Sequence, residues 1–282
     1  MKKLSRAKRT QIVAALVEGN SIRATCRMTG AAKGTVIKLL RDLGRVCAAY
    51  QDQVFQDLPG QRWEADEIWS FAYAKAKNVP QDKQGQFGYG DVWTFTALCA
   101  ETKLVPTWRI GPRDTLTATD FLRDLAGRLA HRVQLTTDGH RMYLEAVEDA
   151  FGCEIDYAQL VKLYGADPEG EKRYSPAKCI GCKKAQVQGR PARQHVSTSY
   201  VERQNLTMRM SLRRFTRLTN AFSKKVENLA HAVALHFMHY NFCRVHQSLG
   251  ITPAVAAGVA DYPWQIGEII ALLEVQEPGG SS

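Results

Sequence analysis

Long apolar runs are missing from this 282-residue sequence, and their absence excludes a simple membrane-spanning protein. No stretch reaches the roughly 18 consecutive apolar residues that a spanning helix needs. The basic start, MKKLSRAKRT, is followed by an amphipathic segment rather than an apolar one, unlike a secretory signal. We therefore expect no membrane partner and a cytoplasmic location.

Cysteine is also scarce, with seven residues spread thinly along the chain. An odd, scattered set indicates reduced thiols rather than a disulfide framework. Within residues 1–50 only Cys26 and Cys47 occur, so cysteines alone cannot build a four-ligand zinc site there. The core must then provide the stability of the fold.

Acidic residues are the minority charge, and their distribution is uneven. The chain has 38 Lys and Arg against 28 Asp and Glu, a net charge of +10. Residues 1–50 carry +9 and residues 162–225 carry +11, which leaves −10 for the rest of the chain. Two basic segments around an acidic one suggest that the outer segments hold a polyanion such as double-stranded DNA, while the carboxylates serve another purpose.

The first basic segment has the pattern of a small helical module. Apolar spacing predicts helices around 12–16, over 21–28 and over about 32–50, with a glycine-containing turn before the third. This order matches a helix-turn-helix domain over residues 1–50, with residues 51–61 as a linker. On the third helix, the side chains expected to face the DNA groove are Lys33, Thr35, Lys38 and Arg41.

The segment after the linker alternates strands and helices. Strands are predicted over 64–72, 92–100, 104–110, 133–137 and 154–163, and helices over 115–129, over 141–151 and from about 199. Three strands followed by alternating helices and strands predict an α/β fold, a mixed sheet with flanking helices. We place this domain at 62–245, with an insertion at about 164–195 and a C-terminal helical extension at 246–282.

Three acidic residues lie in or next to predicted strands, where an α/β sheet could bring them together. Asp66 lies in the first strand, Asp138 ends the fourth, and Glu202 follows in the helix after the fifth. Ligands usually bind at strand ends in α/β sheets. Metal-dependent phosphoryl transfer needs carboxylates that converge from separate elements, because hard cations such as Mg²⁺ take oxygen ligands.

Sequence motifs around these acids resemble those of DDE transposases with the RNase H-like fold, most of all the insertion-sequence-one family of bacterial transposases. The motifs are WEADEIWSF at 63–71, TTDG at 136–139, STSYVERQN at 197–205 and YNFCRVHQSL at 240–249. The resemblance spans roughly residues 60–260. One departure is the 63 residues between Asp138 and Glu202, which imply the insertion.

The resemblance implies a catalytic and metal-binding triad of Asp66, Asp138 and Glu202 that holds two Mg²⁺ or Mn²⁺ ions. Arg203 and Asn205 lie beside Glu202 as supporting residues, although Asn205 could simply pack. The Trp-x-x-Asp spacing selects Asp66 over its neighbour Glu67, because successive strand side chains point to opposite faces and only one should reach the metals.

Two further groups remain open to interpretation. The dense series Arg209, Arg213, Arg214 and Arg217 is expected to follow the DNA backbone. Cys179 and Cys182 form half of a zinc site whose nearest further ligands would be Cys153 and His195, but we favour an exposed loop of reduced thiols. In that loop Lys183 and Lys184 would contact DNA phosphates.

The leading hypothesis is a DNA transposase that binds the terminal repeats of a mobile element, cleaves DNA and joins strands, acting in the bacterial nucleoid. A regulator with a non-catalytic sheet domain is the first alternative and a nuclease without joining activity the second. Because each element end needs its own active site, we expect a homo-oligomer on DNA. Its contacts would come from the apolar C-terminal stretch 264–274.

Overall fold

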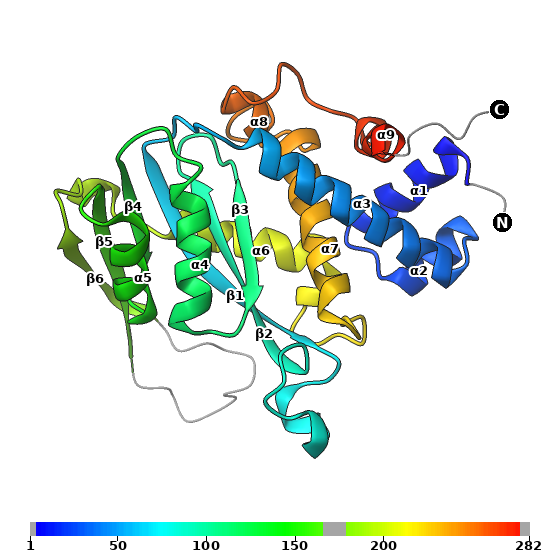
Figure 1. Ribbon diagram of the computed structural model, residues 1–282, viewed down its shortest axis with the longest axis horizontal. Helices are drawn as coiled ribbons and strands as arrows, with labels where there is room; N and C mark the ends of the chain where they lie inside the picture. Colours follow the sequence, from blue (N-terminus) through cyan, green and yellow to red (C-terminus); the bar gives the residue numbers. More distant parts are fainter. Residues whose placement is uncertain (1–3, 166–178, 277–282) are drawn as a thin grey trace.

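The computed structural model describes residues 4–165 and 179–276. Residues 166–178 of the expected insertion therefore lie outside the described residues, as does the end of the C-terminal extension. In the described part of the chain, helices pack on both faces of a mixed sheet, and the N- and C-terminal helices gather at one end (Figure 1). No helix there is long and apolar enough to cross a membrane.

The described residues form a six-stranded sheet of order β3-β2-β1-β4-β5-β6. The antiparallel part is β1 (Arg62–Ala72), β2 (Gly90–Cys99) and β3 (Thr107–Gly111). Next, β4 (Val133–Asp138) pairs in parallel with β1, and β5 (Ile155–Tyr164) pairs in parallel with β4. This mixed sheet confirms the expected α/β class and is consistent with an RNase H-like fold.

The sixth strand was not expected. Residues 179–182, predicted to be an exposed loop, begin β6 (Cys179–Gln188), which pairs antiparallel with β5. Most side chains of β6 are exposed, so the strand lacks the alternation of apolar and polar residues that marks a half-buried strand. Lysines on such an edge strand discourage pairing with a further strand. They also give the segment the polar composition of a loop, which is why the strand was not predicted.

Helices cover both faces of the sheet. On one face lie α4 (Thr115–Ala126) and α5 (Met142–Phe151), which contact each other closely. On the other face α6 (Ser199–Ser211) packs against β1 and β2, and α7 (Val226–Met238) follows it. The ring of Trp108 from β3 lies 5.2 Å from that of Phe237 from α7, so α7 also packs against the sheet.

The N-terminal helices are α1 (Arg6–Val17), α2 (Ile22–Thr29) and α3 (Lys33–Val54). Gly30 ends α2 with a φ of 68°, a left-handed conformation that glycine adopts without strain. The α3 helix continues into the expected linker and packs along α7, and its Gln51 donates to the carbonyl of Ala234. Apolar residues from Ile12 to Ile270 form one continuous core, so these helices are not tethered by a free linker.

The C-terminal elements are α8 (Pro253–Ala256) and α9 (Ile266–Gln276). The α9 helix packs on α1 and α3, where Ile269 and Ile270 are fully buried. Trp264 lies against Tyr50, with a ring-centroid distance of 5.2 Å. Part of the apolar stretch that was expected to join copies of the protein thus covers the protein's own core.

Candidate active site

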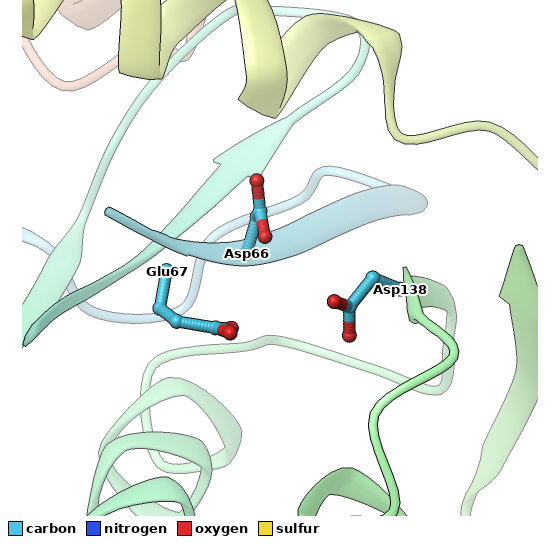
Figure 2. Close-up of side chains that lie close together, drawn as sticks. All are labelled: Asp66, Glu67 and Asp138. Atoms are coloured by element: carbon cyan, nitrogen blue, oxygen red, sulfur yellow. The ribbon is translucent and has the colours of Figure 1, made fainter. Parts of the chain in front are cut away.

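The parallel pairing of β1 and β4 places two acids next to each other. The paired residues run from Arg62 opposite Gln134 to Ala65 opposite Thr137. The residue that follows is Asp66 in β1 and Asp138 in β4. Figure 2 shows both carboxylates beside the end of β4. The sheet therefore brings together the first two acids of the expected triad.

A third carboxylate in this group comes from Glu67, not Glu202. One ligand oxygen each from Asp66, Glu67 and Asp138 lies within 4.8 Å of the others. The expectation that only one of the neighbours Asp66 and Glu67 can approach the site is therefore wrong. Their side chains do leave β1 on opposite faces, but the longer glutamate returns its carboxylate toward Asp138 (Figure 2).

Two residues hold Glu67 in this position. Arg113, just before α4, donates from Nε to Glu67 Oε1 at 2.7 Å, and the Tyr143 hydroxyl of α5 donates to Glu67 Oε2 at 2.6 Å. Arg113 also lies over the ring of Trp93 at 4.5 Å and approaches Asp138 to 3.9 Å. Burial, followed by the charge of Glu67, raises the pKa of the Tyr143 phenol well above its usual value. No sequence motif marked Arg113 or Tyr143.

Asp66 is half-buried on the opposite face, under α6. Asn205 donates from Nδ2 to Asp66 Oδ2 at 2.8 Å. Burial, followed by the charges of Glu67 and Asp138, raises the pKa of Asp66 to about 8. Nearby, Asn205 Oδ1 and Arg209 Nε are buried and have no hydrogen-bond partner among the described residues. The site thus combines closely spaced carboxylates with buried polar atoms that lack a hydrogen-bond partner among the described residues.

Glu202, the expected third acid, lies in the first turn of α6 but outside this group. Its carboxylate pairs with Lys162 of β5 and accepts a hydrogen bond from Thr198. Glu64 of β1 fixes the same turn, because it accepts hydrogen bonds from the backbone amides of Tyr200 and Val201 at 2.8 and 3.0 Å. Burial raises the pKa of Glu64 to about 7. Nothing in the motif at 63–71 distinguished Glu64 from its neighbours.

The basic residues expected to contact DNA have different environments. On α3, Lys33, Lys38 and Arg41 are exposed and Thr35 is half-buried, and Lys38 pairs with Asp42. On β6, Lys183 is exposed, while Lys184 donates to the carbonyl of Arg193. Along and after α6, the exposed members are Arg203, Arg213 and Arg217, with Arg209 half-buried.

Arg214 does not fit the expected DNA-contacting series. Its Nη1 donates to Ser223 Oγ and, at 2.8 Å, to the carbonyl of Asn228. Burial lowers the pKa of its guanidinium to about 10. Through these contacts Arg214 fixes the loop between α6 and α7. The predicted series of arginines assumed a continuous helix, but α6 ends at Ser211, so Arg214 does not lie on the same helical face as Arg209.

The cysteine pair gains no further ligand in the described residues. Cys179 donates to the carbonyl of Gly181 at 3.3 Å, and Cys182 is exposed. His195, one expected partner, instead contacts Arg62, and Cys153 contacts Glu154. Among the described residues only the acidic group has three clustered ligands.

The acidic group suits a hard divalent cation. Carboxylate oxygens are the ligands that Mg²⁺ and Mn²⁺ prefer. Three carboxylates lie close together, with the guanidinium of Arg113 paired to Glu67, and the charges of Glu67 and Asp138 contribute to the raised pKa of Asp66. A bound cation would offset the mutual repulsion of the carboxylates, so Asp66, Glu67 and Asp138 fit such an ion.

Comparisons with known proteins give only distant likenesses. No family model and no curated protein matches the chain. A Mos1 transposase paired-end complex with the left transposon end is 11% identical with a TM-score of 0.21, over 52% of this chain and 58% of that chain. The Mos1 strand transfer complex is 11% identical with a TM-score of 0.25, over 84% of this chain and 76% of that chain.

A third likeness is to a Mos1 mariner paired-end complex with Mn, 10% identical with a TM-score of 0.21, over 52% of this chain and 58% of that chain. The chain thus matches less than two thirds of the first and third of these proteins. Likeness at this level decides no activity, so a functional conclusion depends on the geometry of the site itself.

Proposed function

We propose that this protein is a DNA transposase of the DDE type, in which an RNase H-like sheet carries the active site. The observation that supports this most is the convergence of Asp66, Glu67 and Asp138 within 4.8 Å where the parallel pairing of β1 and β4 ends. Carboxylates gathered from separate strands are what metal-dependent phosphodiester chemistry requires.

In this proposal Asp66 and Asp138 hold one or two Mg²⁺ or Mn²⁺ ions with a third carboxylate. Such ions supply Lewis acidity for attack of water, and then of a DNA 3′-hydroxyl, on a phosphodiester. Asn205 orients Asp66 through its 2.8 Å hydrogen bond. Arg113 keeps Glu67 beside Asp138 and offsets part of the local negative charge.

Basic surfaces would deliver the DNA. The exposed face of α3, with Lys33, Lys38 and Arg41, would recognise the terminal repeats. Arg203 on α6 and Lys183 on β6 would bind the backbone near the cleaved bond, and Arg213 and Arg217 after α6 would bind it farther along the duplex. These cations would bind the DNA phosphates, and the metal ions held by the acidic group would promote cleavage at one phosphodiester.

The test is an assay of cleavage and joining with Mg²⁺ or Mn²⁺ and labelled duplexes from the DNA that flanks the gene. Asp138→Asn should abolish both reactions and leave DNA affinity near wild type, because the phosphate-binding cations are untouched. Asp149→Asn is the matched control, since Asp149 forms an exposed ion pair with Arg123 on α4. This variant should keep full activity.

Three other results of this assay would change the proposed function. Cleavage by Asp138→Asn at the wild-type rate would refute the assignment of the site. Metal-dependent cleavage without joining would identify a nuclease. Sequence-specific binding with no metal-dependent reaction of the wild type would identify a regulator.

A further inference from the structure

The hairpin between β1 and β2 projects beyond the sheet and carries an unbalanced positive charge (Figure 1). Residues 73–90 contain three lysines and one acid, Asp82, and include the short turns Ala76–Asn78 and Gln81–Lys83. Residues 213–225, the loop between α6 and α7, contain five Lys and Arg and no acid. We call these two segments the hairpin–loop surface.

The two segments are joined where β1 ends. The backbone amide of Tyr73 donates to the carbonyl of Ser223 at 2.8 Å, and the rings of Phe71 and Phe222 lie 4.9 Å apart. Ala72 and Ser223 also form an isolated parallel bridge. Apart from Arg214, which fixes the loop, the cations of the hairpin and the loop therefore belong to one surface with a fixed junction.

Aromatic rings, not carboxylates, hold the lysines at this junction. Lys83 lies over Tyr73 at 4.7 Å and over Tyr89 at 5.2 Å, and Lys224 lies over Phe222 at 4.7 Å. Among the ion pairs of the described residues, none involves a lysine of the hairpin–loop surface. A ring positions a cation without neutralising it, so the positive charge stays available to a polyanion.

An open groove of about 480 Å³ lies between the two segments, lined in part by Phe71, Lys75, Asn78 and Leu218. Leu218 is 67% exposed at its rim, and Lys77 and Lys224 are exposed nearby. A groove bordered by cations with aromatic and aliphatic side chains along its wall has the chemistry of a nucleic-acid backbone site.

The position of this surface relative to the acids follows from β1. The strand leads from Asp66 to Ala72, and six residues at about 3.3 Å each cover about 20 Å. Because β1 and β4 are parallel, the hairpin extends from the same end of the sheet at which Asp138 ends β4. A duplex that enters the acidic site can therefore continue toward the hairpin–loop surface.

We propose that the hairpin–loop surface binds backbone phosphates of duplex DNA about six base pairs from the bond that is cut, since 20 Å corresponds to about six steps of 3.4 Å. The inference relies on the proposed function for the location of the cut, but not for the binding itself. Its role is to align the duplex across the acidic site.

The test compares Lys77→Gln/Lys224→Gln with a matched control, Arg109→Gln/Arg123→Gln. The control removes two exposed cations that are paired with Asp120 and Asp149 on another face. Binding of duplexes that extend at least ten base pairs past the cut is measured against salt concentration. Loss of two phosphate contacts should reduce the slope of log affinity against log salt by about 1.8, because each contact contributes about 0.9.

A second readout locates the contact. Hydroxyl-radical footprints of the Lys77→Gln/Lys224→Gln variant should lose protection about six base pairs from the cut, and duplexes that stop three base pairs from it should bind both variants equally. An unchanged slope and footprint would overturn the proposal, as would a change in oligomeric state without DNA, which would mark the surface as a contact between copies. Because binding is measured without catalysis, a chain that binds here but never cleaves would refute only the proposed function.

Discussion

Lys162 of β5 and Glu202 of α6 form an ion pair with an N–O distance of 2.5 Å. In this position Glu202 lies outside the group of Asp66, Glu67 and Asp138. Both side chains are about one third exposed, and ion pairs in that setting contribute about 1 kcal/mol or less. A divalent ion held by Asp66 and Asp138 could therefore compete with Lys162 for Glu202, whereas Glu67 is secured by both Arg113 and Tyr143.

The first prediction concerns the third carboxylate. We expect Glu202→Gln to reduce metal-dependent cleavage about 100-fold, or about 3 kcal/mol of transition-state stabilisation, and Glu67→Gln to reduce it less. The reason is that Arg113 already balances the charge of Glu67. Cleavage rates at saturating Mg²⁺ decide the order, with circular dichroism as the folding control. A greater loss in Glu67→Gln would assign the ligand role to Glu67.

The second prediction concerns Asn205, which donates to Asp66. That hydrogen bond favours the charged carboxylate, so Asn205→Ala should raise the pKa of Asp66 further above about 8. Below this pKa the proton competes with the metal. The variant should need several-fold more Mg²⁺ for half-maximal cleavage at pH 7, and the difference from wild type should shrink at pH 9.

A neighbour on α6 provides the control for this experiment. Among the described residues, the Thr207 hydroxyl donates only to the carbonyl of Arg203 one turn earlier, so Thr207→Ala should keep the wild-type metal requirement. If Asn205→Ala shows the same metal dependence as wild type at both pH values, Asn205 does not act through Asp66.

Much of the sheet could be predicted from local patterns. The strands β1, β2, β4 and β5 alternate or concentrate apolar residues, and their predicted bounds agree with the structure to within about two residues. The placement of Asp66 in the first strand and of Asp138 at the end of the fourth also followed from local patterns. The parallel pairing of β1 and β4, which sets these two acids side by side, joins distant residues and was not predicted.

The partners of Glu67 depend on contacts between distant residues and left no local trace. Arg113 and Tyr143 contact Glu67 across 46 and 76 positions of sequence. The packing of α3 on α7 was missed for the same reason, since polar composition suggested a linker where Gln51 contacts Ala234 of α7 and Phe55 stacks on Phe242 just after it. The spacing of apolar residues predicts which face of a helix or strand is buried, but not which other element packs against that face.

The third prediction tests whether α3 reads DNA sequence. Deletion of residues 1–50 would expose the apolar face of α7, so surface substitutions are the sharper experiment. We expect Lys33→Ala/Lys38→Ala/Arg41→Ala to bind element ends and scrambled duplexes with nearly equal affinity, because base contacts are lost while other cations still bind phosphates. Competition binding measures this ratio. Unchanged discrimination would place recognition elsewhere.

The last prediction concerns His236, which is buried in α7 with a ring-centroid distance of 5.1 Å to Phe237. Burial, followed by the charges of His239 and Arg244, lowers the pKa of His236 to about 3 from an ordinary value of 6.5. Between these values the unfolded chain binds a proton that the folded protein does not, so the free energy of unfolding falls as the pH falls. From pH 7 to pH 5 this amounts to about 2 kcal/mol. Urea unfolding of His236→Gln should show a pH dependence weaker by about that amount, with His131→Gln as the control for removal of an exposed histidine. An equal pH dependence in His236→Gln and wild type would mean that His236 gains a proton without unfolding.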